Sequence, residues 1–156
     1  MKVGKDYFED KKSSFLSIEK DLSLIIRKMM ENQDLMKMLY YTQRDCLSAP
    51  DLSMAQIQTM LDKQIRIIPE LTIQKECPTF VVITFDNFTP NKLNPEFRDC
   101  TINFDILCHP DHWHMGNFKL RPHKIAGEID HMFCGKKLTG IGELQLNHSI
   151  NLVMND

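Results

Sequence analysis

The stretch that decides the fold runs from Phe97 to Cys108 and reads FRDCTINFDILC. Two sets of residues alternate along it, an apolar set of Cys100, Ile102, Phe104, Ile106 and Cys108 and a mostly polar set of Asp99, Thr101, Asn103, Asp105 and Leu107. Alternation with a period of two predicts one long β-strand whose apolar face meets a core. The other face carries two carboxylates and no base, so we expect it to lie outside or against another copy. This pattern favours a scaffold or interface strand over a catalytic one.

Length and composition predict one compact domain. The chain has 156 residues, of which 42% are hydrophobic and 26% are charged, so it can bury a core of its own. Its formal net charge of -2 gives no basic excess for holding nucleic acid through phosphate contacts. We expect residues 1–16 to form a solvated tail and residues 17–156 to form a single α+β domain.

No sequence feature indicates a membrane protein or an exported one. The longest apolar run, Phe80 to Phe85, is far shorter than the roughly 20 residues that a membrane-spanning helix needs. The N-terminus is charged and lacks the apolar segment of a secretion signal. We therefore expect synthesis in a cytoplasm and no membrane partner.

The N-terminal third is predicted to be helical. Ser17 is positioned to cap a first helix whose apolar residues follow the spacing of one helical face. A second short helix is expected to begin near Asn32 and to run toward Tyr41. Ser53 and Gln56 have the spacing of a capping box, which predicts a third helix after them.

The rest of the chain is predicted to be mainly strands with one more helix. The predicted strands are residues 65–73, 79–88, 97–108, 141–146 and 150–154. Pro69 interrupts the first of them, as suits an edge or a bulge, and residues 89–95 read as a hairpin connection. A helix is expected from about residue 120 to residue 133, with Pro122 in its first turn and Gly135 as its stop. This order predicts an α+β fold with an antiparallel or mixed sheet and helices packed on one face.

The cysteines and methionines are expected to serve packing. The five cysteines are odd in number and contain no CxxC pair, which indicates reduced thiols, with Cys100 and Cys108 as small core residues. Four of the ten methionines cluster, namely Met29, Met30, Met36 and Met38. We expect these to fill a core, and the alternative is an adaptor domain that binds a cellular partner through them.

The segment CHPDHWH, from Cys108 to His114, is the candidate metal site. It holds a thiol and three imidazoles, and His112 and His114 would project to the same side of an extended segment. The possible further ligands are His109, Asp111, His123 and His131. Pro110 and Gly116 mark the stretch as a turn, so we favour a polar loop that meets a neighbour. The alternative is a small metal-dependent enzyme that uses this cluster.

No motif predicts other catalysis, and we expect neither a catalytic residue nor a cofactor. The sequence contains no GxSxG elbow, P-loop or HExxH helix. Gly140 and Gly142 form a lone GxG before a strand, where backbone freedom at a bend is the better explanation. Glu128 and Asp130 point in different directions from a helix and are expected to be solvated.

Several short motifs occur along the chain, namely Asn32 to Leu35 with Leu39 to Tyr41, Ile67 to Pro69, Phe97 to Asp99, Leu120 to Pro122, Ile125 to Ile129, and Gly140 to Gly142. Together they resemble a family of structural proteins from tailed bacteriophages, the tail-completion or tail-terminator proteins. The resemblance implies an α+β subunit that forms a ring, usually a hexamer, at the head–tail junction of the virion. Such a ring ends the tail tube and joins it to the head connector; a neck adaptor of a neighbouring ring is the alternative. The protein would be made in the host bacterial cytoplasm.

The ring that the resemblance implies suggests two roles for the polar side of the long predicted strand. The predicted interface or lumen residues are Arg98, Asp99, Thr101, Asn103, Asp105, His112, Trp113 and His114. In a channel, the carboxylates would let genome DNA pass without specific binding. In a subunit interface, Asp99 and Asp105 would need basic partners from the next copy, because unpaired buried charge is costly. The candidate partners are Arg98, Arg121 and Lys124, and the sequence leaves both arrangements open.

Overall fold

The computed structural model describes residues 14–68, 78–93, 98–138 and 142–150, which form helices and two small sheets. The α-helices are α1 (Ser14–Glu31), α2 (Gln33–Tyr40), α3 (Met54–Gln58) and α4 (Arg121–Phe133). The strands are β1 (Ile65–Arg66), β2 (Thr79–Pro90), β3 (Arg98–Cys108), β4 (Lys137–Leu138) and β5 (Gly142–Glu143). Short 3-10 turns occupy Cys46–Ser48 and Pro110–His112.

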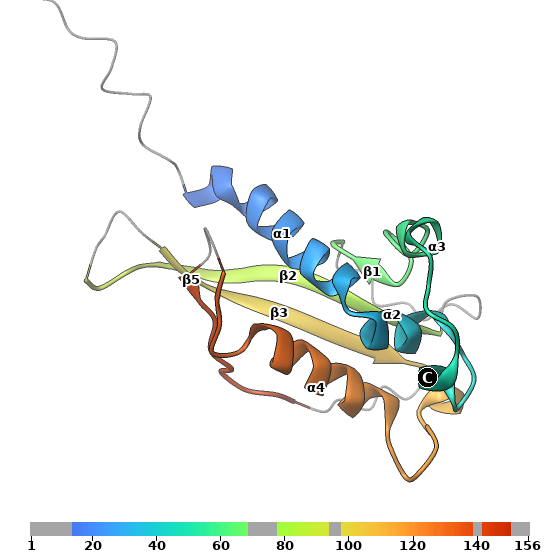
Figure 1. Cartoon of the computed structure of the whole chain (residues 1–156). Coiled ribbons are helices and arrows are strands. Elements are labelled where there is room, and N and C mark those ends of the chain that lie inside the picture. Colours follow the sequence, from blue (N-terminus) through green and yellow to red (C-terminus); the bar gives the residue numbers. More distant parts are fainter. Residues whose placement is uncertain (1–13, 69–77, 94–97, 139–141, 151–156) are drawn as a thin grey trace, which may run out of the picture.

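The main sheet is mixed and carries its helices on one face. Its strand order is β1-β2-β3, with β1 parallel and β3 antiparallel to β2. Helices α1, α2 and α4 lie on the same side of the long β2–β3 ribbon (Figure 1). The predicted α+β fold, with a helical N-terminal region and a mixed sheet, is confirmed.

Local sequence explains most helix boundaries. The Asn32 side chain accepts a hydrogen bond of 3.0 Å from the Leu35 amide and so caps α2 as expected. The capping box of Ser53 and Gln56 is present at the start of α3. The prediction for Ser17 is wrong, because α1 begins at Ser14 and Ser17 lies inside it. Neither proline nor glycine stands between these two serines, so the helix continues by one more turn.

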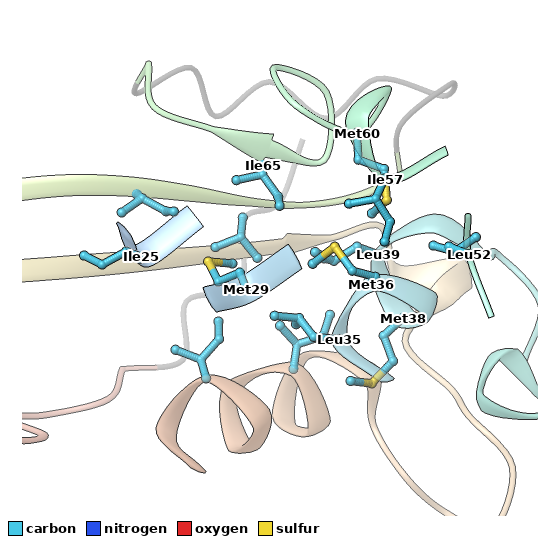
Figure 2. Close-up of a cluster of buried hydrophobic side chains, with 14 of the residues drawn as sticks. Ile25, Met29, Leu35, Met36, Met38, Leu39, Leu52, Ile57, Met60 and Ile65 are labelled. Atoms are coloured by element: carbon cyan, nitrogen blue, oxygen red, sulfur yellow. The ribbon is translucent and has the colours of Figure 1, made fainter. Parts of the chain in front are cut away.

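The core lies between the helices and the sheet and is rich in methionine. Met29, Met36, Met38 and Met60 each have 0% exposure. Figure 2 shows these four side chains among the isoleucines and leucines that pack with them. Three of the four clustered methionines are therefore buried and cannot bind a partner, as the adaptor alternative requires. The fourth, Met30, is half-buried.

The shorter strands differ from the predictions. Strand β1 ends at Arg66, and Ile67 and Ile68 are exposed in a bend; Pro69 and the residues after it, to position 77, lie outside the described residues. The predicted strand 141–146 shrinks to β5, which pairs with the unexpected strand β4. Gly135, at φ +68, turns the chain after α4 and lets these strands meet. Of the predicted strand 150–154, only Ile150 is described, and it is not in a strand.

The outer end of the β2–β3 ribbon projects past the helices (Figure 1). A register shift interrupts the pairing between Asp86 and Thr89, where Asn87 adopts φ 54. Cys100 is exposed here, so its predicted core position is wrong, whereas Cys108 at the covered end is buried as expected. The apolar alternation therefore describes a strand whose first residues extend beyond the helical layer.

Candidate functional site

The side of the sheet away from the helices carries the predicted lumen or interface residues of β3. Residues paired across two strands point to the same face, and the register pairs Thr84 with Asn103 and Asp86 with Thr101. We call the resulting surface the polar face, and it consists of Thr84, Asp86, Asp99, Thr101, Asn103 and Asp105. The Asn103 amide donates to the Thr84 hydroxyl oxygen over 3.4 Å. The structure thus adds two β2 residues that the sequence alone did not place there.

The polar face is acidic and open to solvent. Its three carboxylates, on Asp86, Asp99 and Asp105, are all on exposed residues. Asp99 accepts hydrogen bonds of 3.0 and 3.1 Å from the Asn91 amide, which fixes its carboxylate near the end of the ribbon. None of the six residues that define this face is basic, so the surface offers hydrogen bonds and repels phosphate.

The same side of the sheet becomes apolar toward β1. Phe80, Val82 and Leu107 form a second buried cluster there, so Leu107 belongs to a core although it alternates with polar residues. Arg66 is 8% exposed, and its guanidinium carbon lies 3.7 Å from the centre of the Phe80 ring. Arg66, a base on the apolar part, is therefore held against an aromatic ring.

Arg121 joins the start of α4 to the end of α2, a role within the chain that the sequence did not predict. It has 0% exposure, and its guanidinium donates to the carbonyl oxygens of Met38, Tyr41, Thr42, Gln43 and His112 over 2.5 to 3.2 Å. These contacts satisfy carbonyls that the end of a helix leaves without partners. A cation in the first turn of a helix interacts unfavourably with the helix dipole. The position of Arg121 at the start of a predicted helix was therefore the sequence feature that could have indicated a special role.

The intersubunit partners expected for Asp99 and Asp105 are mostly engaged within the chain. Arg121 is fully buried, and the Lys124 ammonium lies 3.1 Å from a Glu128 carboxylate oxygen. Two of the three predicted bases are thus committed on the helical side of the molecule, and Arg98 at the start of β3 is the one that is exposed.

Glu128 joins two helices and is not the solvated residue that the sequence predicted. Its side chain is 17% exposed and also accepts a 3.1 Å hydrogen bond from the Asn32 amide. Burial acts to raise the pKa of Glu128, but the hydrogen bonds from Asn32 and Lys124 and the charge of Lys124 outweigh it and lower the pKa. Asp130 is exposed, as expected.

The histidine segment forms a turn after β3, in which the His109 and His112 rings meet edge to face with their centroids 6.1 Å apart. The His109 ring accepts from the Asp111 amide over 3.3 Å, whereas the His112 Nδ1 lies 3.2 Å from the Thr42 carbonyl oxygen. The Cys108 thiol contacts the Thr79 hydroxyl oxygen at 3.4 Å, and burial raises its pKa, which disfavours a metal-binding thiolate. Among the described residues, no three histidine, cysteine or acidic side chains are grouped so as to hold a metal ion. His123 and His131 are exposed on α4 and join no such group.

The two parts of the predicted interface lie far apart. Arg98 to Asp105 occupy the outer and middle parts of β3, whereas His112 to His114 follow its other end. At about 3.3 Å per residue, Asp99 and Cys108 are roughly 30 Å apart along the strand. Trp113 is half-buried and donates from its indole nitrogen to the Cys108 carbonyl oxygen over 2.7 Å, so it closes the turn.

A tight hairpin turn follows Trp113 and presents a phenylalanine to solvent. His114 and Leu120 pair across it, and the Met115 amide donates to the Lys119 carbonyl oxygen over 2.8 Å. Asn117 and Phe118 at its centre have φ 60 and 59, as in a type I′ turn. Phenylalanine in this conformation costs about 1–2 kcal/mol relative to ordinary backbone.

Comparison with known protein families identifies the chain. The model of the YomW family matches residues 32–156, which include every element from α2 to β5. The chain belongs to the YomW family. This family is of phage origin, so the protein is phage-associated. No curated protein and no solved structure matches the YomW-family chain. Within the described ranges, none of its helices is long and apolar enough to span a membrane.

Proposed function

We propose that this YomW-family protein is a structural component of the phage particle, rather than a catalyst, and forms a ring at the head–tail junction. The ring, expected to be a hexamer, would end the tail tube and join it to the head connector. The observation that carries this proposal is the acidic polar face on a ribbon that projects beyond the helical layer. A two-stranded ribbon without cover is marginal on its own, and contacts in an assembly would stabilise it.

The fold and the family support the same function. The α+β fold agrees with the α+β subunit that the resemblance to tail-terminator proteins implied. The family is of phage origin. The histidine segment offers no grouped ligands within the described residues, so the metal-dependent enzyme has no geometric support there.

The engaged bases favour the channel over the subunit interface for the polar face. Asp99 and Asp105 would need cations from the next copy in an interface, and Arg121 and Lys124 already have partners within their own chain. In a channel, the same carboxylates stay hydrated and face DNA that they repel. We therefore propose that the polar face lines the lumen.

Deletion of the gene and imaging of the particles test this function. Without the protein, filled heads and finished tails should accumulate separately, and the wild-type gene supplied in trans should restore joined particles. A reconstruction of wild-type particles should place the subunit around the tail axis with rotational symmetry. A ring one layer nearer the head would instead identify the neck adaptor. Joined, infectious particles without the gene product would refute a junction role.

A further inference from the structure

The exposed tip of the turn after Trp113 is a rigid apolar knob. Phe118 has 105% exposure and stands between Asn117 and Lys119, both exposed. The turn is held in place by the buried Met115 and by the hydrogen bond from the Arg121 amide to the Trp113 carbonyl oxygen, 2.7 Å long. A side chain presented on a fixed turn loses little freedom when it binds.

A groove lined largely by apolar side chains, which suits an apolar knob, lies between α1 and the segment that leads into β1. Its volume is about 410 Å³, and its apolar lining comes from Ile26, Met30, Leu61, Ile65 and Ile67. Pockets of roughly 300–1,000 Å³ accommodate ordinary small ligands, so a benzyl group fits within this volume. Ile67 is 46% exposed and Leu61 37% exposed, so the lining is accessible from outside.

We propose that Phe118 of one copy inserts into this groove on the next copy, and that Lys119 then pairs with Asp62 at the groove's edge. This inference rests on the proposed ring and names the contact that would build it. Asp62 lines the groove, and Lys119 follows the knob directly. Within the described residues, neither the Lys119 ammonium nor the Asp62 carboxylate takes part in a salt bridge, so both charges are available to meet across a contact.

The positions of knob and groove require a head-to-tail contact. The knob follows β3, whereas the groove includes β1, and these strands are the two opposite edges of the sheet. In Figure 1 the loop between β3 and α4 extends away from the sheet, on the side opposite to β1. A copy therefore cannot fill its own groove. Repetition of one head-to-tail contact closes into a ring when the rotation between copies allows it.

Photo-crosslinking in assembled phage particles tests the contact directly. A benzoylphenylalanine at position 118 keeps an aromatic knob, and mixed labelled and unlabelled copies distinguish contacts between copies from contacts within one. We expect crosslinks to peptides that contain residues 23–30 or 61–67 of another copy. The same probe at Met54, which is 63% exposed on α3, is the control and should not reach the groove. Crosslinks from position 118 to a different phage protein, or none to the groove, would overturn the proposal.

A charge exchange provides a second, independent test. Lys119→Asp and Asp62→Lys should each reduce incorporation of the protein into particles at least tenfold, and the double variant should recover most of it. Thermal unfolding of each purified variant checks that the fold is intact. Single variants with normal incorporation, or a double variant no better than either, would contradict the pairing.

These tests separate the contact from the proposed function. A symmetric ring at the junction whose position-118 crosslinks avoid the groove would reject the knob contact alone. Crosslinks between knob and groove in a protein that lies elsewhere in the particle would support the contact and reject the junction role.

Discussion

The two ends of the β2–β3 ribbon differ in how their polar groups are satisfied. At the covered end, Arg121 satisfies five carbonyl groups and is completely buried. At the outer end, Asp86, Asp99 and Cys100 are exposed, and a register shift breaks the strand pairing. The carbonyl groups at the covered end are thus hydrogen-bonded within the chain, whereas the polar groups at the outer end remain available to other molecules. The stability of the fold should depend on the first end, and the interactions of the polar face should depend on the second.

The largest effect is expected from removal of the Arg121 guanidinium. Arg121→Met leaves several buried carbonyl oxygens without donors, at about 1–3 kcal/mol each, so we expect a loss of about 4 kcal/mol in the free energy of unfolding. Urea titration measures this free energy of unfolding. Arg27→Met, at an exposed site of α1, is the matched control and should stay within about 0.5 kcal/mol. A loss below about 1 kcal/mol in Arg121→Met would show that the covered end does not depend on this residue.

The outer end is tested by reversing its charge. Asp99→Lys combined with Asp105→Lys should leave the fold intact and create affinity for duplex DNA. Two phosphate contacts predict a roughly tenfold fall in that affinity between about 50 and 200 mM salt. The control, Asp34→Lys with Asp130→Lys, makes the same net charge change at exposed positions of α2 and α4.

The assembly of these charge variants separates the arrangements of the polar face. Rings that form normally and bind DNA support a channel, whereas failure of ring formation identifies a subunit interface. Normal rings without a gain in DNA affinity over the control would mean that the polar face looks outward to solvent.

A smaller effect is expected at the histidine turn. His112→Ala with His114→Ala removes one hydrogen bond to the Thr42 carbonyl oxygen, so the free energy of unfolding should fall by about 1 kcal/mol. Thermal unfolding and elemental analysis of the purified protein measure the outcome. Stoichiometric zinc that disappears with these substitutions, together with a large fall in melting temperature, would restore the metal site.

The smallest effect concerns pH. Because the folded protein lowers the pKa of Glu128, this residue contributes stability above its unfolded pKa of about 4.3 and loses it as the pH falls through the lower folded value. The free energy of unfolding of the wild type should therefore fall more steeply than that of Glu128→Gln between about pH 5 and pH 3. Parallel curves for the two proteins would show that the contacts of Glu128 do not favour its charged form.

Patterns carried by neighbouring residues were predicted well from the sequence. The alternation in β3, the cap at Asn32 and the capping box of Ser53 and Gln56 each depend on residues a few positions apart. Ser17 shows the limit of such signals, because a capping residue type does not start a helix when the preceding residues can also be helical.

Features that depend on distant residues could not be predicted in the same way. The contacts of Arg121 reach back to residues 38–43, and the polar face acquires Thr84 and Asp86 only when β2 pairs with β3. Cys100 is exposed because the helical layer ends before it. The alternation within one strand carries no information about where that layer ends. The groove beside β1 likewise joins α1 to residues some 40 positions later.

The contacts of Arg121 also bear on how the protein is made. Arg121 and Met38 are 83 residues apart, and at about 5–20 residues per second a ribosome needs roughly 4–17 s to add the residues between them. During that interval the carbonyl groups at the end of α2 remain bonded to water. In a nascent chain the end of α2 therefore reaches its final contacts only after Arg121 has been synthesised, and a subunit ready for assembly cannot arise before then.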